Sequence, residues 1–178
     1  MPDQPSHPAV RRVLDAAKRK GIELEISSFA ESTHTAEEAA AALGAELGQI
    51  VKSLVFVVPG DAGEVEPVLC LVSGVNRVDM ARLAAATGEP SIRRATAREA
   101  NELTGFTIGG IPPIGHSRTL RVIMDPDLGR YETVWAAAGL PTAVFPVPPA
   151  TLRMLSNAEV TPLAEVVRQA DLEAALGG

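Results

Sequence analysis

Two apolar segments, IVKSLVFVV (50–58) and EPVLCLVSG (66–74), decide the fold of this chain. Residues 59–64 between them, PGDAGE, are rich in turn-forming residues, so the pair is predicted to form a β-hairpin. Both segments are apolar at successive positions and not only at alternate ones, which indicates strands buried on both faces. We therefore expect this hairpin to lie at the centre of a sheet.

Helices are predicted on either side of the hairpin in sequence. Val10 to Ala17 has helical spacing and is followed by Gly21, while Thr35 and Glu38 have capping-box spacing before an alanine-rich run that Gly44 ends. Further helices are expected over 77–88, after the capping-box pair Thr96 and Glu99, over 151–155 and over 163–176. Strands are expected over 22–26, 120–125, 133–138 and 143–147.

Strands and helices alternate along the chain, yet neighbouring strands are joined by short turns. This order favours an α+β fold, with a mixed, strongly curved or barrel-like sheet flanked by helices, over a strictly parallel sheet. The length of 178 residues fits a single domain spanning 1–178, in which we expect residues 1–8 to form a flexible tail. Only 3% of the residues are aromatic, so the core must consist mostly of aliphatic side chains.

The composition narrows the function classes. A formal net charge of -6 argues against a protein that coats nucleic acid through a general positive field. A single cysteine, Cys70, permits no intrachain disulfide and lies in an apolar strand, where it is most simply a core residue. The polar N-terminus does not resemble a secretory signal, and no apolar run reaches the roughly 18 residues of a membrane span. We expect a soluble, cytoplasmic protein without a membrane partner.

Lys52 is the strongest single oddity, because its ammonium group stands within an apolar strand. Lysine is rarely buried without a partner. One interpretation is that the side chain extends from the strand end to solvent. The other is that it faces a pocket, where it would attract a phosphate or polarise a carbonyl group.

The second oddity is the loop IGGIPPIGH, residues 108–116. Gly109 and Gly110 permit positive φ or close approach to a ligand, whereas the two prolines cannot donate hydrogen bonds. Free amide donors are therefore concentrated at residues 109–111, which would suit an oxyanion hole. An ordinary tight connection is the alternative. The loop lacks the GxGxxG spacing of a dinucleotide-binding site.

The remaining polar residues show no familiar catalytic spacing. His34 and His116 belong to no close histidine pair, there is no GxSxG motif, and neither a metal site nor a serine triad is expected. His34, just before a helix, is also explained as a plain loop residue. Arginines that could hold a phosphate backbone recur at Arg77, Arg82, Arg93, Arg94, Arg98, Arg118 and Arg121, although solvated surfaces explain most such residues.

In this order, the segments ESTHTAEEAAAALG, QIVKSLVF, LVSGVNRVDMARLAAATG, ELTGFTIGGIPPIG and LRVIMDPDL strongly resemble the YbaK/EbsC family of aminoacyl-tRNA deacylases. The family includes the editing domain inserted in some bacterial prolyl-tRNA synthetases and free-standing ProX-like relatives. The resemblance spans about residues 10–166 and implies trans-editing, the hydrolysis of the ester of a mischarged tRNA. It implies no cofactor, and it makes the acceptor end of aminoacyl-tRNA the ligand and prolyl-tRNA synthetase a possible partner.

The resemblance also assigns residues. Lys52 matches the key lysine of the family, and Gly109 and Pro113 match a GxxxP loop beside the substrate carbonyl, so Lys52, Gly109 and Gly110 are the implied catalytic residues. The implied substrate-binding residues are Phe29, Thr33, His34, Ser73, Gly74, Ile111, Pro113, His116 and Asp125. The chain departs from many relatives at Ala137, Ala138 and Gly139, where a GAG-like turn is common, and at His116.

The resemblance does not fix the amino acid removed. A small pocket could exclude proline and admit cysteine or alanine. A catalytically silent module that binds a tRNA end or a nucleotide is the alternative from another class, and a metal-dependent hydrolase is a third.

Overall fold

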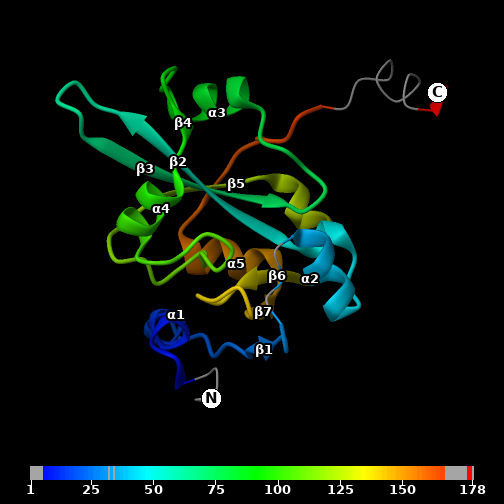
Figure 1. Ribbon diagram of the computed structural model, residues 1–178. Coiled ribbons are helices and arrows are strands. Elements are labelled where there is room, and N and C mark those ends of the chain that lie inside the picture. The colour runs from blue at the N-terminus through cyan, green and yellow to red at the C-terminus, as the bar shows by residue number, and fades with distance from the viewer. Residues whose placement is uncertain (1–5, 32, 34, 167–175, 178) are drawn as a thin grey trace.

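The predicted hairpin forms the centre of the larger of two sheets. The computed structural model describes residues 6–31, 33, 35–166 and 176–177. In it, β2 (Val51–Pro59) and β3 (Val65–Ser73) pair antiparallel, with Lys52 opposite Val72. The strand order is β4-β2-β3-β5-β8 (Figure 1). The outer strands are β4 (Arg93–Arg94), antiparallel to β2, and β5 (Arg121–Met124) and β8 (Glu159–Val160), which run parallel to β3 and β5 respectively.

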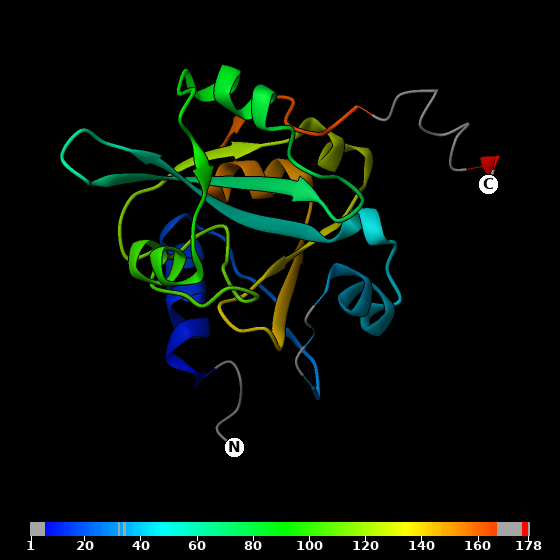
Figure 2. The ribbon, with the colours of Figure 1, turned by 45° about the horizontal axis from the view of Figure 1, so that its top comes forward.

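A smaller, antiparallel sheet lies below this one. Its order is β1-β7-β6, built from β1 (Ser27–Ser28), β7 (Ala143–Val147) and β6 (Val134–Ala137). An isolated parallel bridge between Ile50 and Trp135 joins it to the start of β2. Figure 2 shows the yellow strands of this smaller sheet below the teal and green strands of the larger one. The mixed α+β architecture is therefore confirmed, as two linked sheets and not as a closed barrel.

Five α-helices cover these sheets in the described part of the chain: α1 (Pro8–Arg19), α2 (Ala36–Leu43), α3 (Met80–Thr87), α4 (Ala97–Thr104) and α5 (Pro149–Ser156). Two 3-10 helices, η2 (Leu47–Gln49) and η3 (Pro126–Arg130), complete the framework. The predicted capping box of α4 is present, with Thr96 and Glu99 each bonded to the other's backbone amide. In α2, Thr35 caps the first turn, and Gly44 ends the helix in a left-handed conformation.

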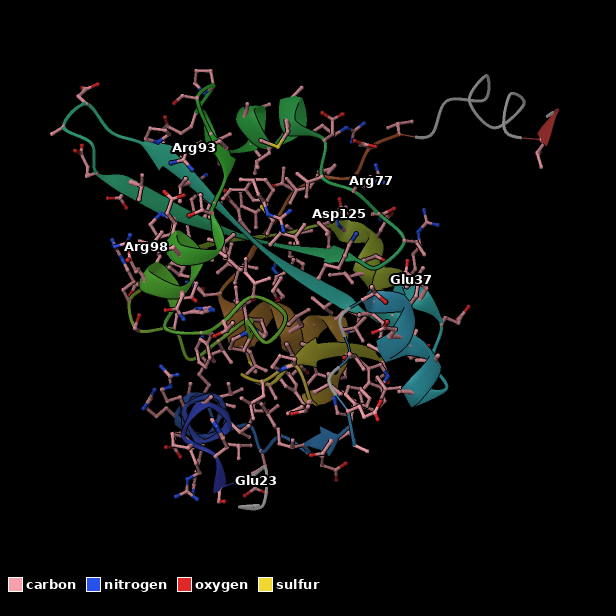
Figure 3. All side chains as sticks on the ribbon, in the orientation of Figure 1. Glu23, Glu37, Arg77, Arg93, Arg98 and Asp125 are labelled. Carbon is pink, nitrogen blue, oxygen red and sulfur yellow. The ribbon has the colours of Figure 1, made fainter. Side chains whose placement is uncertain are left out.

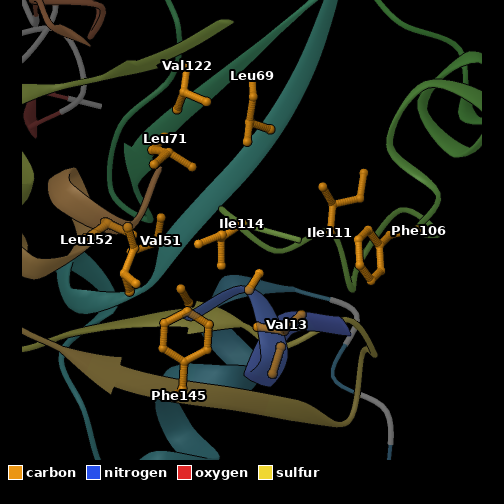
Figure 4. Close-up of a cluster of buried hydrophobic side chains, with 14 of the residues drawn as sticks. Val13, Val51, Leu69, Leu71, Phe106, Ile111, Ile114, Val122, Phe145 and Leu152 are labelled. Carbon is orange, nitrogen blue, oxygen red and sulfur yellow. The ribbon is translucent and has the colours of Figure 1, made fainter. Parts of the chain in front are cut away.

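The hairpin separates two cores. Val51, Val55 and Val57 of β2 face a core that includes residues of α1, α4, α5 and the smaller sheet (Figure 4). Phe56 faces the other side of the sheet, where it packs with Leu83 of α3. This alternation follows from the two-residue period of a strand.

Some expectations at the ends of elements are wrong. Residues 22–26 form no strand, because Ile22, Leu24 and Ile26 pack against the core without a ladder partner. Residues 163–166 are not helical, and the rest of that predicted helix lies almost wholly outside the described residues. Helix α1 begins at Pro8, with His7 as its cap, and residues 1–5 of the predicted tail lie outside the described residues. Among the described helices, none has the length and apolarity needed to cross a membrane.

Candidate active site

A cavity lies along the part of β2 that β4 leaves uncovered. β4 pairs with β2 only at Phe56 and Val57, so no strand that the structure describes is paired with the edge from Val51 to Val55. The cavity has a volume of about 230 Å³. It is lined by Thr33, Thr35, Ala36, Ala39, Ile50, Val51, Lys52, Ser53, Leu54, Val55, Arg94, Ala95, Ala100, Ile108, Gly109, Ile111, Trp135, Ala137, Leu140, Pro141 and Val144.

The cavity wall consists mainly of short apolar side chains. Five of the lining residues are alanines: Ala36, Ala39, Ala95, Ala100 and Ala137. Of the described residues in the lining, those with side chains that can be charged are Lys52 and Arg94, and none is acidic. The site thus combines room for a small apolar group with a cationic rim.

Lys52 is half-buried at this cavity, and its ammonium group donates a hydrogen bond to the backbone carbonyl of Asn76. The Asn76 side chain in turn donates to Asp127 Oδ2 at 2.8 Å, which holds this acceptor in place. Burial lowers the pKa of Lys52 below its ordinary value; the charge of Glu37 opposes this shift, and the charges of Arg77 and Arg94 add to it. Of the carboxylates that the structure describes, none forms an ion pair with Lys52. The ammonium group is therefore oriented by a neutral acceptor.

The predicted arginines fall into two groups. Arg82, Arg93, Arg98, Arg118 and Arg121 form ion pairs with acidic residues. Arg94 lines the cavity with its guanidinium 5.5 Å from the centre of the Phe56 ring, and Arg77 lies close enough to influence Lys52. Figure 3 shows Arg93 and Arg98 on the opposite side of the molecule from Arg77 and Glu37. The structure thus brings Arg77 and Arg94, but not the whole set, to the lysine.

The glycine loop reaches the same cavity as Lys52. Ile108, Gly109 and Ile111 line it, and Gly109 has a φ of 96°, which favours glycine. Gly110 was expected to offer a free amide donor to the site, but it does not line the cavity. Its N–H donates to the carbonyl of Thr107 at 3.0 Å, so this amide is already used within the turn. A Cβ at Gly110 would lie 2.8 Å from the backbone of Leu140, which explains the glycine by packing.

The segment before α2 also contributes to the cavity. Thr33 lines it, and its hydroxyl donates to the carbonyl of Pro141 at 3.1 Å. Phe29 does not line the cavity; it packs behind the wall against a cluster containing Ile50 and Trp135. His34, the other predicted residue of this segment, lies outside the described residues.

Ser73 and Gly74 shape the end of the hairpin and do not line the cavity. The buried Ser73 hydroxyl donates to the Gly48 carbonyl at 2.7 Å, and Gly74 N–H donates to the Ile50 carbonyl at 2.8 Å. A Cβ at Gly74 would lie 2.4 Å from the carbonyl oxygen of Leu47. Both residues hold η2 against the hairpin.

His116 and Pro113 lie behind the glycine loop. His116 Nε2 lies 2.6 Å from the Pro112 carbonyl oxygen, and the ring meets Phe106 edge-on. Burial lowers the pKa of His116, and the hydrogen bond to Pro112 partly opposes this shift. Pro113 is buried and, like His116, does not line the cavity. These two residues stabilise the second half of the loop, which does not reach the cavity.

Asp125 is buried after β5, where its carboxylate is occupied by the backbone. Oδ1 accepts from Asp127 N–H at 2.8 Å, and Oδ2 accepts from Leu163 N–H at 2.7 Å and Ala164 N–H at 2.9 Å. It does not line the cavity. The acidic residue after β5 thus anchors the C-terminal segment of the described fold.

Several cavity residues carried no signal in the sequence. Thr35 was identified only as a helix cap, and Trp135, Leu140 and Pro141 belong to a strand and turn that have no chemical motif. The presence of the only tryptophan of the chain, Trp135, was the one available hint. Their placement depends on the smaller sheet packing beside β2, which local patterns do not specify.

Comparison with known proteins identifies the family. The family model for the aminoacyl-tRNA editing domain matches residues 30–155. The fold is similar to the crystal structure of a candidate trans-editing enzyme for prolyl-tRNA synthetase, with a TM-score of 0.81, 46% identity, and coverage of 90% of this chain and 99% of that chain.

Two curated relatives are similar over most of their length. A candidate Cys-tRNA(Pro)/Cys-tRNA(Cys) deacylase, EbsC of Enterococcus faecalis, is 27% identical over 137 residues, which are 75% of this chain and 81% of EbsC. The multifunctional Ser/Thr-tRNA deacylase ProXp-y of Escherichia coli K12 is 28% identical over 131 residues, 73% of this chain and 77% of ProXp-y. With the family model covering more than half of its length, this chain belongs to the aminoacyl-tRNA editing domain family, the deacylases that hydrolyse the ester bond of aminoacyl-tRNA.

Proposed function

We propose that this deacylase acts in trans on mischarged tRNA(Pro) and releases a small amino acid, cysteine or alanine. The observation that carries the proposal is that Lys52 and Gly109, far apart in sequence, line one small cavity walled by alanines. A cavity of about 230 Å³ suits the amino acid and its ester linkage rather than a whole nucleotide. The names of EbsC and ProXp-y, which act on cysteine and on serine or threonine esters, support a small amino acid.

In the proposed mechanism, the protein orients an ester that is already reactive. Lys52 binds the terminal nucleotide at the cavity rim and stabilises negative charge that develops at the ester carbonyl. Gly109 places the loop backbone against the carbonyl, while Gly110 supports the turn from within. Water attacks the ester carbonyl, and the bond to the ribose oxygen breaks to release the free amino acid and the tRNA. The proton of the water passes to the leaving ribose oxygen by way of the substrate's neighbouring ribose hydroxyl, its amine or the thiol of cysteine, so no protein base is required.

Proline is excluded by the shape of the cavity in this proposal. One methylene in an apolar pocket is worth about 1–3 kcal/mol, so walls of short side chains discriminate by roughly 10- to 200-fold. Partnership with prolyl-tRNA synthetase belongs to the same proposal. It is supported by the described role of the structural relative at 46% identity.

A deacylation panel tests the proposal. Purified protein is incubated with tRNA(Pro) carrying cysteine, alanine, serine or proline, and release of the amino acid is followed against uncatalysed hydrolysis. We expect fast release of cysteine or alanine and slow release of proline. Binding of all four without release would instead identify a silent binding module. Release of proline at the highest rate would refute the proposed selectivity.

A further inference from the structure

The uncovered edge of β2 presents main-chain hydrogen-bonding groups to the cavity. Residues of β2 direct their N–H and C=O groups alternately to β3 and away from it. The carbonyl of Ile50 accepts from Gly74 N–H at 2.8 Å, whereas the carbonyl of Val55 accepts from Ala95 N–H at 3.0 Å. Even-numbered residues therefore bond to β3, and the odd-numbered residues 51, 53 and 55 point outward. Along β2, Ser53 lies between the Ile50–Trp135 bridge on one side and the Val55–Ala95 hydrogen bond on the other.

Ser53 is unsatisfied at this open position. Its pairing with Leu71 is of the type without hydrogen bonds, so its N–H and C=O point away from β3, and within the described part of the chain no strand is paired with β2 at Ser53 on that side. The Ser53 hydroxyl is buried and also lacks a partner there. Ser53 as a whole is half-buried, but a buried hydroxyl without a partner costs free energy, so its presence beside outward main-chain groups at a cavity points to a ligand that pairs with this position.

An aminoacyl group has the matching pattern. Its amine and its carbonyl are arranged like the N–H and C=O of one strand residue, which can pair with another strand residue through two hydrogen bonds. Among the described residues that line the cavity, none carries a carboxylate that could receive the amine. The outward carbonyl of Ser53 is a neutral acceptor at the cavity wall.

We propose that Ser53 recognises the substrate through its main chain, its carbonyl accepting from the α-amino group and its N–H donating to the acyl carbonyl. The inference rests on the proposed function, since it takes the aminoacyl ester as the ligand. It gives the site a requirement that size selection does not provide. The acyl group must carry a free α-amine, whatever its side chain.

Binding of non-hydrolysable analogues tests this recognition apart from catalysis. The probes are adenosines with an alanyl or a propionyl group in a 3′-amide linkage, which differ only in the amine. We expect the wild-type protein to bind the alanyl analogue about tenfold more tightly. Equal dissociation constants would overturn the proposal.

A backbone variant assigns this difference to Ser53. Leu54→leucic acid replaces the peptide bond after Ser53 by an ester and weakens the Ser53 carbonyl as an acceptor, so the tenfold ratio should fall by several-fold. The matched control, Phe56→phenyllactic acid, loses the same kind of hydrogen bond to β3 but alters the Val55 carbonyl, which Ala95 already occupies. An unchanged ratio in the Leu54 variant, or an equal fall in the control, would contradict the assignment.

Nuclear magnetic resonance of the wild-type protein adds a readout that needs no variant. The Ser53 amide proton should shift downfield on binding the alanyl analogue, while that of Phe56, which points to β3, should not. Absence of a shift at Ser53 would overturn the proposed donor. If both binding results hold but no ester is hydrolysed, the proposed function fails while the recognition of the amine stands.

Discussion

Lys52 has two features that rarely occur together, an apolar setting and a free charge. The hydrogen bond to Asn76 fixes its position but leaves its charge uncompensated by any described carboxylate within ion-pairing distance. We expect Lys52→Met to lower kcat/KM for deacylation by about 10²–10³-fold, the usual effect of losing one group that stabilises an oxyanion. The melting temperature should change little, because the removed charge is half-buried.

The control for this variant is Lys18→Met, which removes an exposed lysine of α1. It changes the net charge equally and should leave deacylation intact. Comparable losses in both variants would show that general electrostatics, and not the position of Lys52, governs activity.

The lowered pKa of Lys52 predicts a shift in pH dependence. The charged form is the active one, so kcat/KM corrected for uncatalysed hydrolysis should fall on the alkaline side, starting below the ordinary lysine value of 10.5. In Lys52→Arg, any residual activity should lack this fall, because arginine stays protonated. A wild-type profile that is flat up to pH 10.5 would contradict the assignment.

At the residue scale, the sequence predicted what is chemically unusual and missed what is ordinary. Lys52 and Gly109 stood out because a cation in a strand and a glycine pair beside prolines are uncommon, and both line the cavity. Leu140 and Trp135 reach it only through the packing of the smaller sheet. Asp125 resembled a ligand-binding residue, yet its oxygens are occupied by backbone amides.

The glycine loop is the element on which the cavity depends most. Gly110 packs against the Leu140 backbone, so Gly110→Ala should force the loop away from the smaller sheet and destabilise the protein by about 1–3 kcal/mol. Because the loop lines the cavity, kcat/KM should fall even under conditions in which the variant is fully folded. The matched control is Gly129→Ala in η3, where an added Cβ meets no atom within 4 Å. Urea unfolding and deacylation rates measure both effects. Equal stability of the two variants would contradict the close packing described for the loop.

The His116 brace should make this element sensitive to acid. Because the folded-state pKa is lowered, the unfolded chain binds more protons as the pH falls through 6.5, and stability decreases from there toward the folded-state pKa. His116→Phe keeps the aromatic contact with Phe106 but loses the bond to Pro112. It should be less stable at pH 8 and lose less stability between pH 8 and pH 5, as measured by urea unfolding. An identical pH dependence of stability in the wild type and in His116→Phe would show that groups other than His116 cause the acid sensitivity.

Elements with a strong local signal were predicted well. The capping residues of α2 and α4 and the apolar runs of β2 and β3 are present as expected. Strands of two residues, such as β1 and β4, had no detectable period and were missed. The segment 22–26 had the period of a strand, but no neighbouring strand is available to pair with it.

The described molecule is held together at its C-terminal side by Asp125. Its two oxygens connect β5 with η3 and with residues 163 and 164, and the residue is only 2% exposed. Asp125→Asn should cost about 2–4 kcal/mol of unfolding free energy, because the amide has only one accepting oxygen and its NH2 group would face backbone N–H donors. Thermal denaturation measures the loss, and kcat/KM well below the melting temperature should persist. A normal melting temperature with lost activity would instead indicate that Asp125 binds the substrate.

The five alanine methyl groups that line the cavity belong to α2, α4, β6 and the segment after β4, so four separate elements each present small side chains to one space. A larger side chain at one of these positions should narrow the cavity from the side of its own element. In the proposed function, a change in the amino acid that the enzyme accepts therefore requires no change of fold. Each alanine position can change the width of the cavity separately. A combinatorial library at these five positions should therefore yield deacylases with altered amino-acid selectivity.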